Sequence, residues 1–180
     1  MVEILKLTQI NDSLTKQWGH NGYITNQVYE VNATNRPDAT IFSLTKIEKK
    51  YRKDWKTTFD DIQNYNEIIK EGHSFGAFES HQFVGMIICN ARTWNNTLHV
   101  ETILVSEKPR RKNIGQKLIE NVKRHSKVNK FRLVELETQN TNVPAIDFYL
   151  KQGFNITGIN LKLYNTEKEI AFFMTYENGV

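Results

Sequence analysis

The stretch VSEKPRRKNIG, residues 105–115, joins two segments of opposite character. The segment before it, TLHVETILVS (97–106), is largely apolar and typical of a buried strand. The segment after it, IGQKLIENVKRHSK (114–127), has an apolar stripe at helical spacing, formed by Ile114, Leu118, Ile119 and Val122. Between the two lie the cations Lys108, Arg110, Arg111 and Lys112. The sequence therefore predicts a basic turn from a strand into a helix.

Such a turn is suited to binding an anion. The first backbone N–H groups of a helix have no partner inside the helix, and the helix dipole is positive at that end. A pyrophosphate fits there, and Arg110 and Lys112 would add charge-assisted hydrogen bonds. The alternatives are an exposed basic turn and a patch for nucleic acid or lipid. The position between an apolar strand and an amphipathic helix favours a phosphate-binding site.

The patterns on both sides of this turn predict a mixed α/β (α+β) fold, in which a central sheet has helices on both faces. The two strands that flank His81 and Gln82 form a hairpin, and Asn95-Asn96 makes the next turn. In the second helix, Asn142 is a candidate N-cap, Pro144 lies in the first turn and Gly153 ends the helix. The predicted elements are strands at 3–10, 73–80, 83–94, 97–106, 131–138, 154–165 and 169–177, and helices at 114–127 and 142–153.

Residues 11–72 have weaker patterns. Apolar residues at 62, 65, 68 and 69 follow a helical period, and Gly72 is a stop signal. The basic run KIEKKYRK (46–53) is interpreted as the solvated face of a helix rather than an RNA-binding patch.

Composition narrows the class of protein. The 180 residues suit a single domain spanning 1–180, and 39% hydrophobic with 24% charged residues is typical of a globular chain. A net charge of +4 does not require a nucleic-acid partner, and aromatic residues do not interleave with the basic runs.

The single cysteine, Cys89, lies within an apolar run and is expected to be a small buried side chain. The five histidines show no metal-site spacing. With no leader pattern and no membrane-spanning run, we expect a cytoplasmic protein without a membrane partner.

Two motifs carry a resemblance to a known family. VSEKPRRKNIGQKLIE resembles the acyl-coenzyme A signature of the GNAT superfamily of N-acetyltransferases, which reads Arg or Gln, two residues, Gly, one residue, then Gly or Ala. Arg110 opens the signature and Gly115 ends it, but Asn113 stands at the usual middle glycine. Asn is the non-glycine residue that best tolerates the left-handed region, so we expect the turn to keep its shape. The replacement of this glycine by asparagine is expected to affect the affinity for the coenzyme.

The second motif is NVPAIDFYLKQGF, which resembles the later helix of the same superfamily. Asn142, Ala145, Tyr149, Gly153 and Phe154 occupy the family positions. The two motifs cover roughly residues 75–176. The segments LETQNTNVPAIDFY, TWNN and LKLYNTEKEIAFFMTYE resemble the streptothricin acetyltransferase branch more closely.

The resemblance implies a mostly antiparallel sheet with a splayed strand pair that forms a coenzyme cleft, and acetyl transfer from acetyl-coenzyme A (acetyl-CoA) to an amine without a metal. Backbone groups of 103–105 would line the pantetheine arm and polarise the thioester carbonyl. The basic turn with Gln116 would bind the pyrophosphate, and Asn142 would lie beside the pantetheine. The implied coenzyme contacts are Ile103, Leu104, Val105, Arg110, Arg111, Lys112, Asn113, Ile114, Gly115, Gln116, Asn142 and Ala145.

Two residues are candidates for proton transfer. Tyr149 would protonate the leaving thiolate, because a phenol pKa near 10 lies close enough to a thiol pKa near 8.5 for the proton to be transferred. The alternative role of Tyr149 is a core side chain beside Phe148. Glu101 lies mid-strand, where a charged side chain is costly unless it is ion-paired or hydrated. It is the candidate base, acting through a water molecule. Strand alternation places His99, Glu101 and Ile103 on one face, so His99 is a partner of Glu101 or an alternative base.

The acceptor is expected to be a small cationic amine such as a streptothricin-type antibiotic with lysine-like amino groups, which a carboxylate near the cleft would attract. The alternatives are a protein or peptide amine, and a module that binds acyl-CoA without catalysis. A nucleic-acid partner is not expected. The fold also allows a homodimer.

Overall fold

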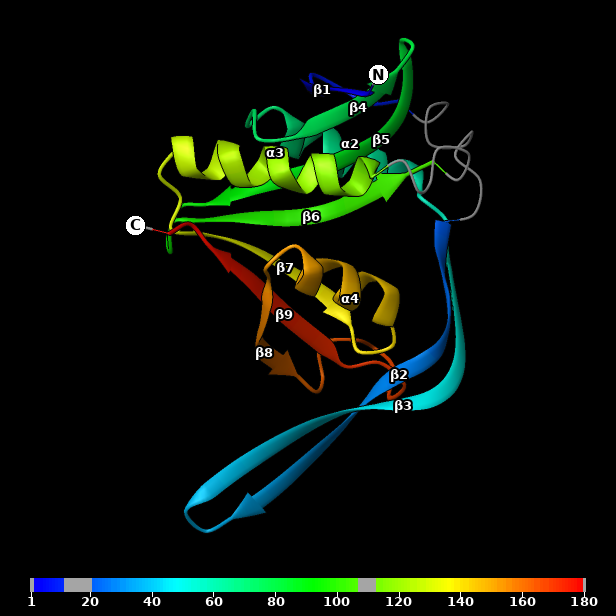
Figure 1. The fold of residues 1–180 in the computed structure, drawn as a ribbon, viewed down its shortest axis with the longest axis vertical. Helices are drawn as coiled ribbons and strands as arrows, with labels where there is room; N and C mark the ends of the chain where they lie inside the picture. Colours follow the sequence, from blue (N-terminus) through cyan, green and yellow to red (C-terminus); the bar gives the residue numbers. More distant parts are fainter. Residues whose placement is uncertain (1, 12–20, 107–112, 180) are drawn as a thin grey trace. The chain divides into compact units, whose positions relative to one another are not determined.

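The computed structural model describes residues 2–11, 21–106 and 113–179. Its elements, drawn in Figure 1, are β1 (Val2–Lys6), β2 (Asn21–Arg36), β3 (Ala39–Trp55), α2 (Phe59–Ile69), β4 (Phe75–Glu79), β5 (Gln82–Arg92), β6 (Thr97–Val105), α3 (Ile114–Val128), β7 (Leu133–Gln139), α4 (Val143–Lys151), β8 (Asn155–Asn160) and β9 (Ala171–Glu177).

The main sheet has the strand order β1-β4-β5-β6-β7-β9-β8, and β2 and β3 form a separate two-stranded sheet. The pairs β1–β4, β4–β5 and β5–β6 are antiparallel, whereas β6 and β7 are parallel. This arrangement confirms the predicted mixed, mostly antiparallel sheet.

The chain divides into two compact units, each described below by itself. Unit 1 comprises Met1–Asn21, Trp55–Leu136 and Thr175–Val180, and unit 2 comprises Gly22–Asp54 and Glu137–Met174. Two of the boundaries fall within β7 and β9, so two strands of the main sheet contribute residues to both units. The other two fall at the first residue of β2 and the last residue of β3.

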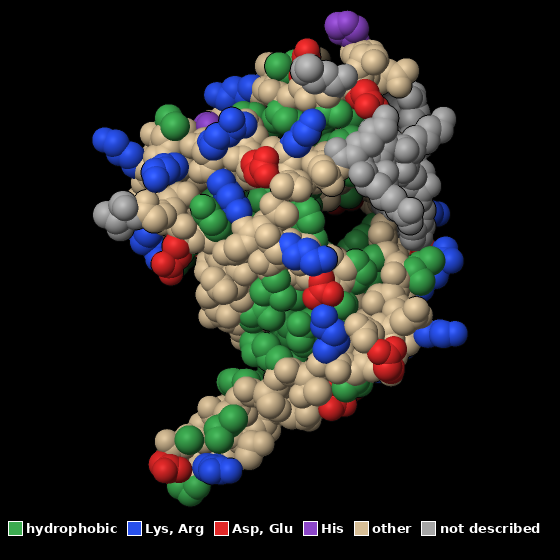
Figure 2. Space-filling model, viewed as in Figure 1, with side chains coloured by type: hydrophobic (Ala, Val, Ile, Leu, Met, Phe, Trp, Pro, Cys, Tyr) green, Lys and Arg blue, Asp and Glu red, His purple; other side chains and the backbone are tan. Residues whose placement is uncertain are grey.

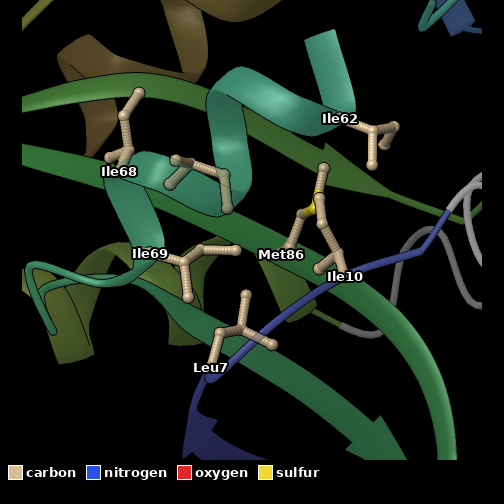
Figure 3. Packing of buried hydrophobic residues seen from close by; sticks show 7 residues of the cluster. Leu7, Ile10, Ile62, Ile68, Ile69 and Met86 are labelled. Atoms are coloured by element: carbon tan, nitrogen blue, oxygen red, sulfur yellow. The ribbon is translucent and has the colours of Figure 1, made fainter. Parts of the chain in front are cut away.

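Helices lie on both faces of the sheet in unit 1. Met86 and Ile88 of β5 join a buried cluster with Ile62, Ile68 and Ile69 of α2 (Figure 3). On the other side of β5, a Cβ on Gly85 would lie 3.2 Å from Cγ2 of Ile114, the first residue of α3. Because side chains alternate along a strand, α2 and α3 cover opposite faces, as predicted.

Local signals set the ends of α2. Thr58 caps its first turn: the Asp61 N–H donates to Thr58 Oγ1 at 3.1 Å, and the Thr58 N–H donates to Asp61 Oδ2 at 2.7 Å. This reciprocal pair satisfies two N–H groups that the helix leaves free. Gly72, with φ +80°, ends the segment, as the stop signal predicted.

The predicted hairpin over 73–94 is confirmed, with a small shift of its turn. Ser80 and His81 have φ of 48° and 65°, so these two residues make the turn and Gln82 already belongs to β5. Positive φ at both central residues matches the twist of the flanking strands. Asn96, with φ 55°, lies in the next turn as predicted.

The interpretation of KIEKKYRK as a helix face is wrong. These residues lie in β3, which pairs with β2 in a long twisted ribbon (Figure 1). Gln27 Nε2 donates to Glu48 Oε1 across the ribbon at 2.5 Å, and Tyr23 stacks on Tyr51 with centroids 6.1 Å apart. Most side chains of β3 are exposed, so no buried face imposed the alternation by which a strand is normally identified. Figure 2 shows hydrophobic and charged side chains together near the far end of this ribbon.

In unit 2, α4 begins and ends where its sequence signals predict. The Asn142 side chain accepts a hydrogen bond from the Ala145 N–H at 3.3 Å, Pro144 lies in the first turn, and Gly153 follows with φ +80°. The next two strands are shorter than predicted, because β8 ends at Asn160 and β9 begins at Ala171. They are neighbours in the sheet, as expected for a hairpin.

Candidate functional site

Strand β6 carries a bulge at Glu101. Thr102 pairs with Ile88 and Val100 pairs with Cys89, so Glu101 is the extra residue opposite β5. A bulge re-aims the side chain that it contains. The Glu101 side chain is exposed, although the residues just before it, His99 and Val100, are buried.

The bulge changes which residues share a face. Oε2 of Glu101 lies 3.8 Å from Nε2 of His99, so these two are neighbours as predicted. Beyond the bulge the alternation is reset: Leu104 packs on the α2 cluster opposite Met86, and Ile103 therefore points to the other face. The prediction that Ile103 shares a face with His99 and Glu101 is wrong, because an extra residue shifts a period of two.

His99 is a poor base at neutral pH. Burial, with a contribution from Arg92, lowers the pKa of His99 to about 4, and Glu135 opposes this shift. Glu135 is already engaged, since it accepts from Arg92 Nη1 at 2.8 Å and from Thr97 Oγ1 at 2.9 Å. Nδ1 of His99 has no hydrogen-bond partner among the described residues. The imidazole is therefore neutral near pH 7.

The three residues expected along the thioester lie at the end of β6. Val105, Leu104 and Ile103 pair with Gly85, Met86 and Ile87 of β5 and are half-buried. The parallel ladder of β6 with β7 runs from Thr97↔Leu133 to Val100↔Leu136, while β6 continues to Val105 and β7 to Gln139. The ladder thus ends beside the bulge.

At the start of α3, Asn113 adopts the left-handed conformation, with φ 57° and ψ 26°. This confirms the expectation that an asparagine at this position tolerates the left-handed region. Its side chain makes no capping hydrogen bond, and the first helical bond runs from the Lys117 N–H to the Asn113 carbonyl at 3.0 Å. The N–H groups of Ile114, Gly115 and Gln116 therefore precede the first bond of the helix. Arg110, Arg111 and Lys112 lie outside the described residues.

The remaining predicted residues lie on α4 in unit 2. Tyr149 is buried, and its ring contacts those of Phe148 and Phe154, with centroids 5.3 and 5.7 Å apart. Ala145 and Asn142 are half-buried one and two turns before it. The Asn142 carbonyl oxygen Oδ1 is used by the helix cap, which leaves its amide nitrogen available as a donor. The candidate residues thus form two groups, one on β6 and α3 of unit 1 and one on α4 of unit 2.

Cys89 is buried, and its N–H donates to Ser74 Oγ at 3.1 Å. Burial raises the pKa of its thiol, so the thiolate needed for a covalent acyl-cysteine route is disfavoured. The prediction of a small buried side chain is confirmed. Within the described ranges, no group of three or more His, Cys, Asp or Glu residues has the arrangement of a metal site. None of the described helices is long and apolar enough to cross a membrane.

Sequence reasoning missed Asn140. Its backbone and side chain bind two distant segments, those of Tyr29 and Ile170, and it lies beside a cavity of about 460 Å³ in unit 2. Because these bonds connect residues 111 and 30 positions apart, no local pattern marks Asn140.

Comparisons with known proteins identify acetyltransferases as similar to this chain. A model of the acetyltransferase (GNAT) family matches residues 41–154. A streptothricin acetyltransferase of Escherichia coli is 32% identical over 152 residues, covering 84% of this chain and 80% of that protein. Streptothricin acetyltransferase A of Bacillus subtilis (strain 168) is 30% identical over 140 residues, covering 76% and 79%.

Solved structures share the fold. A nourseothricin acetyltransferase superposes with a TM-score of 0.77 at 21% identity, covering 99% of both chains. A protein of Bacillus anthracis str. Ames, described as a streptothricin acetyltransferase and crystallised in complex with acetyl coenzyme A, superposes with a TM-score of 0.72 at 24% identity, covering 98% of this chain and 99% of that one. Together with the two motifs and the sheet order, these similarities show that the chain belongs to the acetyltransferase (GNAT) family.

Proposed function

We propose that the protein is an N-acetyltransferase that transfers the acetyl group of acetyl-CoA to a primary amine of streptothricin or a similar small cationic acceptor. The observation that carries this proposal is the start of α3, where Asn113 is left-handed and, among the described residues, provides no side-chain cap for the first N–H groups of the helix. The named substrate is supported by two streptothricin acetyltransferases at 30% and 32% identity.

The coenzyme would be held at two places. Backbone N–H groups of Ile114, Gly115 and Gln116, with the positive end of the helix dipole, would bind the pyrophosphate. The adjoining Arg110, Arg111 and Lys112 would add charge-assisted bonds. Ile103, Leu104 and Val105 would bind the pantetheine arm through their backbones and polarise the thioester carbonyl, and Asn142 and Ala145 would lie along the same arm.

Glu101 is the proposed base. An amine must lose its proton before it attacks a thioester, because an ammonium ion has no lone pair. The bulge leaves the Glu101 carboxylate exposed, where it can bind water and attract a cation. His99 is the weaker candidate, since an imidazole with a pKa of about 4 accepts protons poorly near neutrality.

Tyr149 is the proposed acid. Its phenol would give a proton to the thiolate as the carbon–sulfur bond breaks, which leaves free coenzyme A and an acetylated amine. The ring is held by Phe148 and Phe154, so a fixed orientation of the hydroxyl supports this role.

We further propose that the two units act as one catalytic domain over residues 1–180. The family match supports this, because 41–154 includes residues of both units. The lone cysteine supports a cytoplasmic location. A homodimer, which the fold allows, would be detected by light scattering of the purified protein.

The test is release of free thiol from acetyl-CoA by purified protein with streptothricin, lysine, a peptide with a free amino terminus, or no acceptor. We expect rapid release with streptothricin and background release without acceptor. Release with the peptide alone would move the proposal to a peptide amine. Coenzyme binding by calorimetry without release for any acceptor would instead indicate a non-catalytic module, and a lack of coenzyme binding would reject the site on α3.

A further inference from the structure

Two polar atoms lie buried side by side in the sheet of unit 1. Nδ1 of His99 and Oδ1 of Asn90 make no hydrogen bond within the described part of the chain. Asn90 of β5 is directly opposite His99 of β6 in the antiparallel ladder, so both side chains lie on one face of the sheet. Because buried polar atoms are nearly always hydrogen-bonded, the pair indicates a partner shared by both atoms.

The ring of His99 lies between two carboxylates. Its Nε2 lies 3.8 Å from Oε2 of Glu101, and its Nδ1 lies 3.8 Å from Oε1 of Glu135. An ionised carboxylate only accepts hydrogen bonds, and a neutral imidazole has a single N–H to donate. Burial lowers the pKa of His99 to about 4, so the ring is neutral near pH 7. Only one of its nitrogens can therefore donate to a carboxylate.

The two carboxylates differ in what they already bind. Oε1 of Glu135 accepts from Arg92 Nη1 at 2.8 Å and from Thr97 Oγ1 at 2.9 Å, and these bonds hold it away from the ring. Glu101 is exposed, so a rotation of its side chain can bring an oxygen within hydrogen-bond distance of Nε2. A proton on Nε2 gains a charge-assisted bond, whereas a proton on Nδ1 leaves a buried N–H without an acceptor in reach. This comparison favours the proton on Nε2.

The same tautomer explains the two buried atoms. With the proton on Nε2, Nδ1 of His99 is an acceptor, as Oδ1 of Asn90 is. Two acceptors cannot bond to each other, but one water molecule can donate a hydrogen to each. Buried waters bridge polar groups in this way. A donor at Nδ1 also keeps the proton on Nε2, because the bond made by one ring nitrogen sets the state of the other.

We propose that Asn90, through one bridging water, keeps the proton of His99 on Nε2, and that this N–H donates to the Glu101 carboxylate. Both are positioning residues for the base, and neither takes a proton from the amine. The bond to Oε2 of Glu101 leaves Oε1 for proton transfer in a fixed orientation. This inference rests on the proposed function, since it concerns the base of that reaction.

The first test is the tautomer of His99 in the full chain. Histidine is labelled with nitrogen-15, and the ring-nitrogen chemical shifts near pH 7 distinguish a protonated from an unprotonated nitrogen. The signals that are missing from His99→Gln identify His99 among the five histidines. We expect a protonated Nε2 and an unprotonated Nδ1, and the Nδ1 shift should move in Asn90→Val, which removes the acceptor that holds the water. A protonated Nδ1 in the parent overturns the proposal.

The second test is a double-mutant cycle on thiol release with streptothricin. His99→Leu should lower kcat/KM by about tenfold in the parent but by less than about twofold in Glu101→Gln, because its effect passes through Glu101. His99→Gln keeps an N–H donor near the position of Nε2 and should stay within about threefold of the parent. His81→Gln, in the exposed β4–β5 turn, is the matched control and should leave turnover unchanged. Thermal unfolding checks that each variant is folded.

The outcomes separate this inference from the proposed function. Equal losses from His99→Leu in both backgrounds would indicate a purely structural role and overturn the positioning. Equal losses in His99→Gln and His99→Leu would assign a proton-transfer role to the ring and also overturn it. If no acceptor supports thiol release, the proposed function fails and the positioning role fails with it, while the chemical shifts still decide the hydrogen bond to Glu101.

Discussion

The imidazoles of His73 and His125 share one hydrogen bond, with Nδ1 of His73 2.8 Å from Nε2 of His125. His125 lies in the last turn of α3, and His73 lies just before β4. Phe131 and Phe75 pack against the pair, with centroid distances of 5.3 and 5.1 Å. Such a bond needs one protonated and one unprotonated nitrogen, so it is lost when both rings become cations.

This pair predicts acid sensitivity of unit 1. Burial lowers the pKa of both histidines, and the nearby cation Lys6 lowers both further. His73 also lowers the pKa of His125, whereas Glu71 raises the pKa of His73 and so opposes the shift there. As the pH falls, the unfolded chain therefore binds more protons than the folded chain does. The contribution of the pair to the free energy of unfolding is complete above about pH 6.5 and is lost below it. Denaturant unfolding of the parent should show the free energy of unfolding falling from pH 7.5 to 5.

The variant His73→Gln should show a shallower fall over this range, because one titrating partner is gone. His81→Asn, in the exposed β4–β5 turn, is the control and should keep the parental slope. The buried His99 contributes equally in all three proteins. An unchanged slope in His73→Gln would show that the pair does not govern the pH dependence.

Substitutions at Asn113 test the turn before α3. With φ 57°, Asn113→Gly should bind acetyl-CoA at least as tightly as the parent, because glycine adopts this conformation freely. Asn113→Val should weaken either the binding of acetyl-CoA or the stability of the fold by roughly 1–2 kcal/mol, because a branched side chain is strained in the left-handed conformation. Calorimetry with acetyl-CoA and thermal unfolding measure the two effects. Parental affinity and stability in the valine variant would contradict the required turn geometry.

Removal of the Tyr149 hydroxyl separates chemistry from coenzyme binding. Tyr149→Phe should lower kcat by about 100-fold, a usual loss for a general acid, and change acetyl-CoA affinity less than about twofold. Tyr164→Phe is a matched control, because the Tyr164 hydroxyl donates to Glu137 and has no proposed role in catalysis. Equal kcat in both variants would assign the proton to another group.

The role of Glu101 is tested by its amide. Glu101→Gln should lower kcat/KM by about 100-fold near neutral pH, while acetyl-CoA affinity stays unchanged. Glu67→Gln, an exposed glutamate of α2 paired with Lys70, should leave turnover as it is. A parental kcat/KM in Glu101→Gln would leave His99, or water alone, as the base.

Packing between α2 and β5 sets the stability of unit 1. Ile69 is 2% exposed within the cluster that includes Met86, so Ile69→Ala should cost about 2–5 kcal/mol of unfolding free energy. Val128→Ala, at a side chain that is 79% exposed, should change it by less than about 0.5 kcal/mol. Denaturant midpoints measure both, and similar values would mean that the cluster does not limit stability.

Much of the fold was predictable because its signals are local. The apolar stripe of α3, the Asn142 cap, the Gly153 stop and the β4–β5 turn each depend on residues within a few positions of one another. The left-handed Asn113 was predictable for the same reason, since backbone sterics of a single residue decide it. The role of each candidate site residue stays a prediction.

The sequence by itself determined where α3 and α4 begin, that Asn113 can adopt the left-handed region, and which family motifs these helices carry. Only the tertiary structure decided that 46–53 lies in a ribbon, that Glu101 is the extra residue of a bulge, and that Asn140 joins Tyr29 to Ile170. The physical reason is the range of the interactions. Helix caps and turns are closed by neighbouring residues, whereas strand register and buried polar contacts form only when distant segments pair.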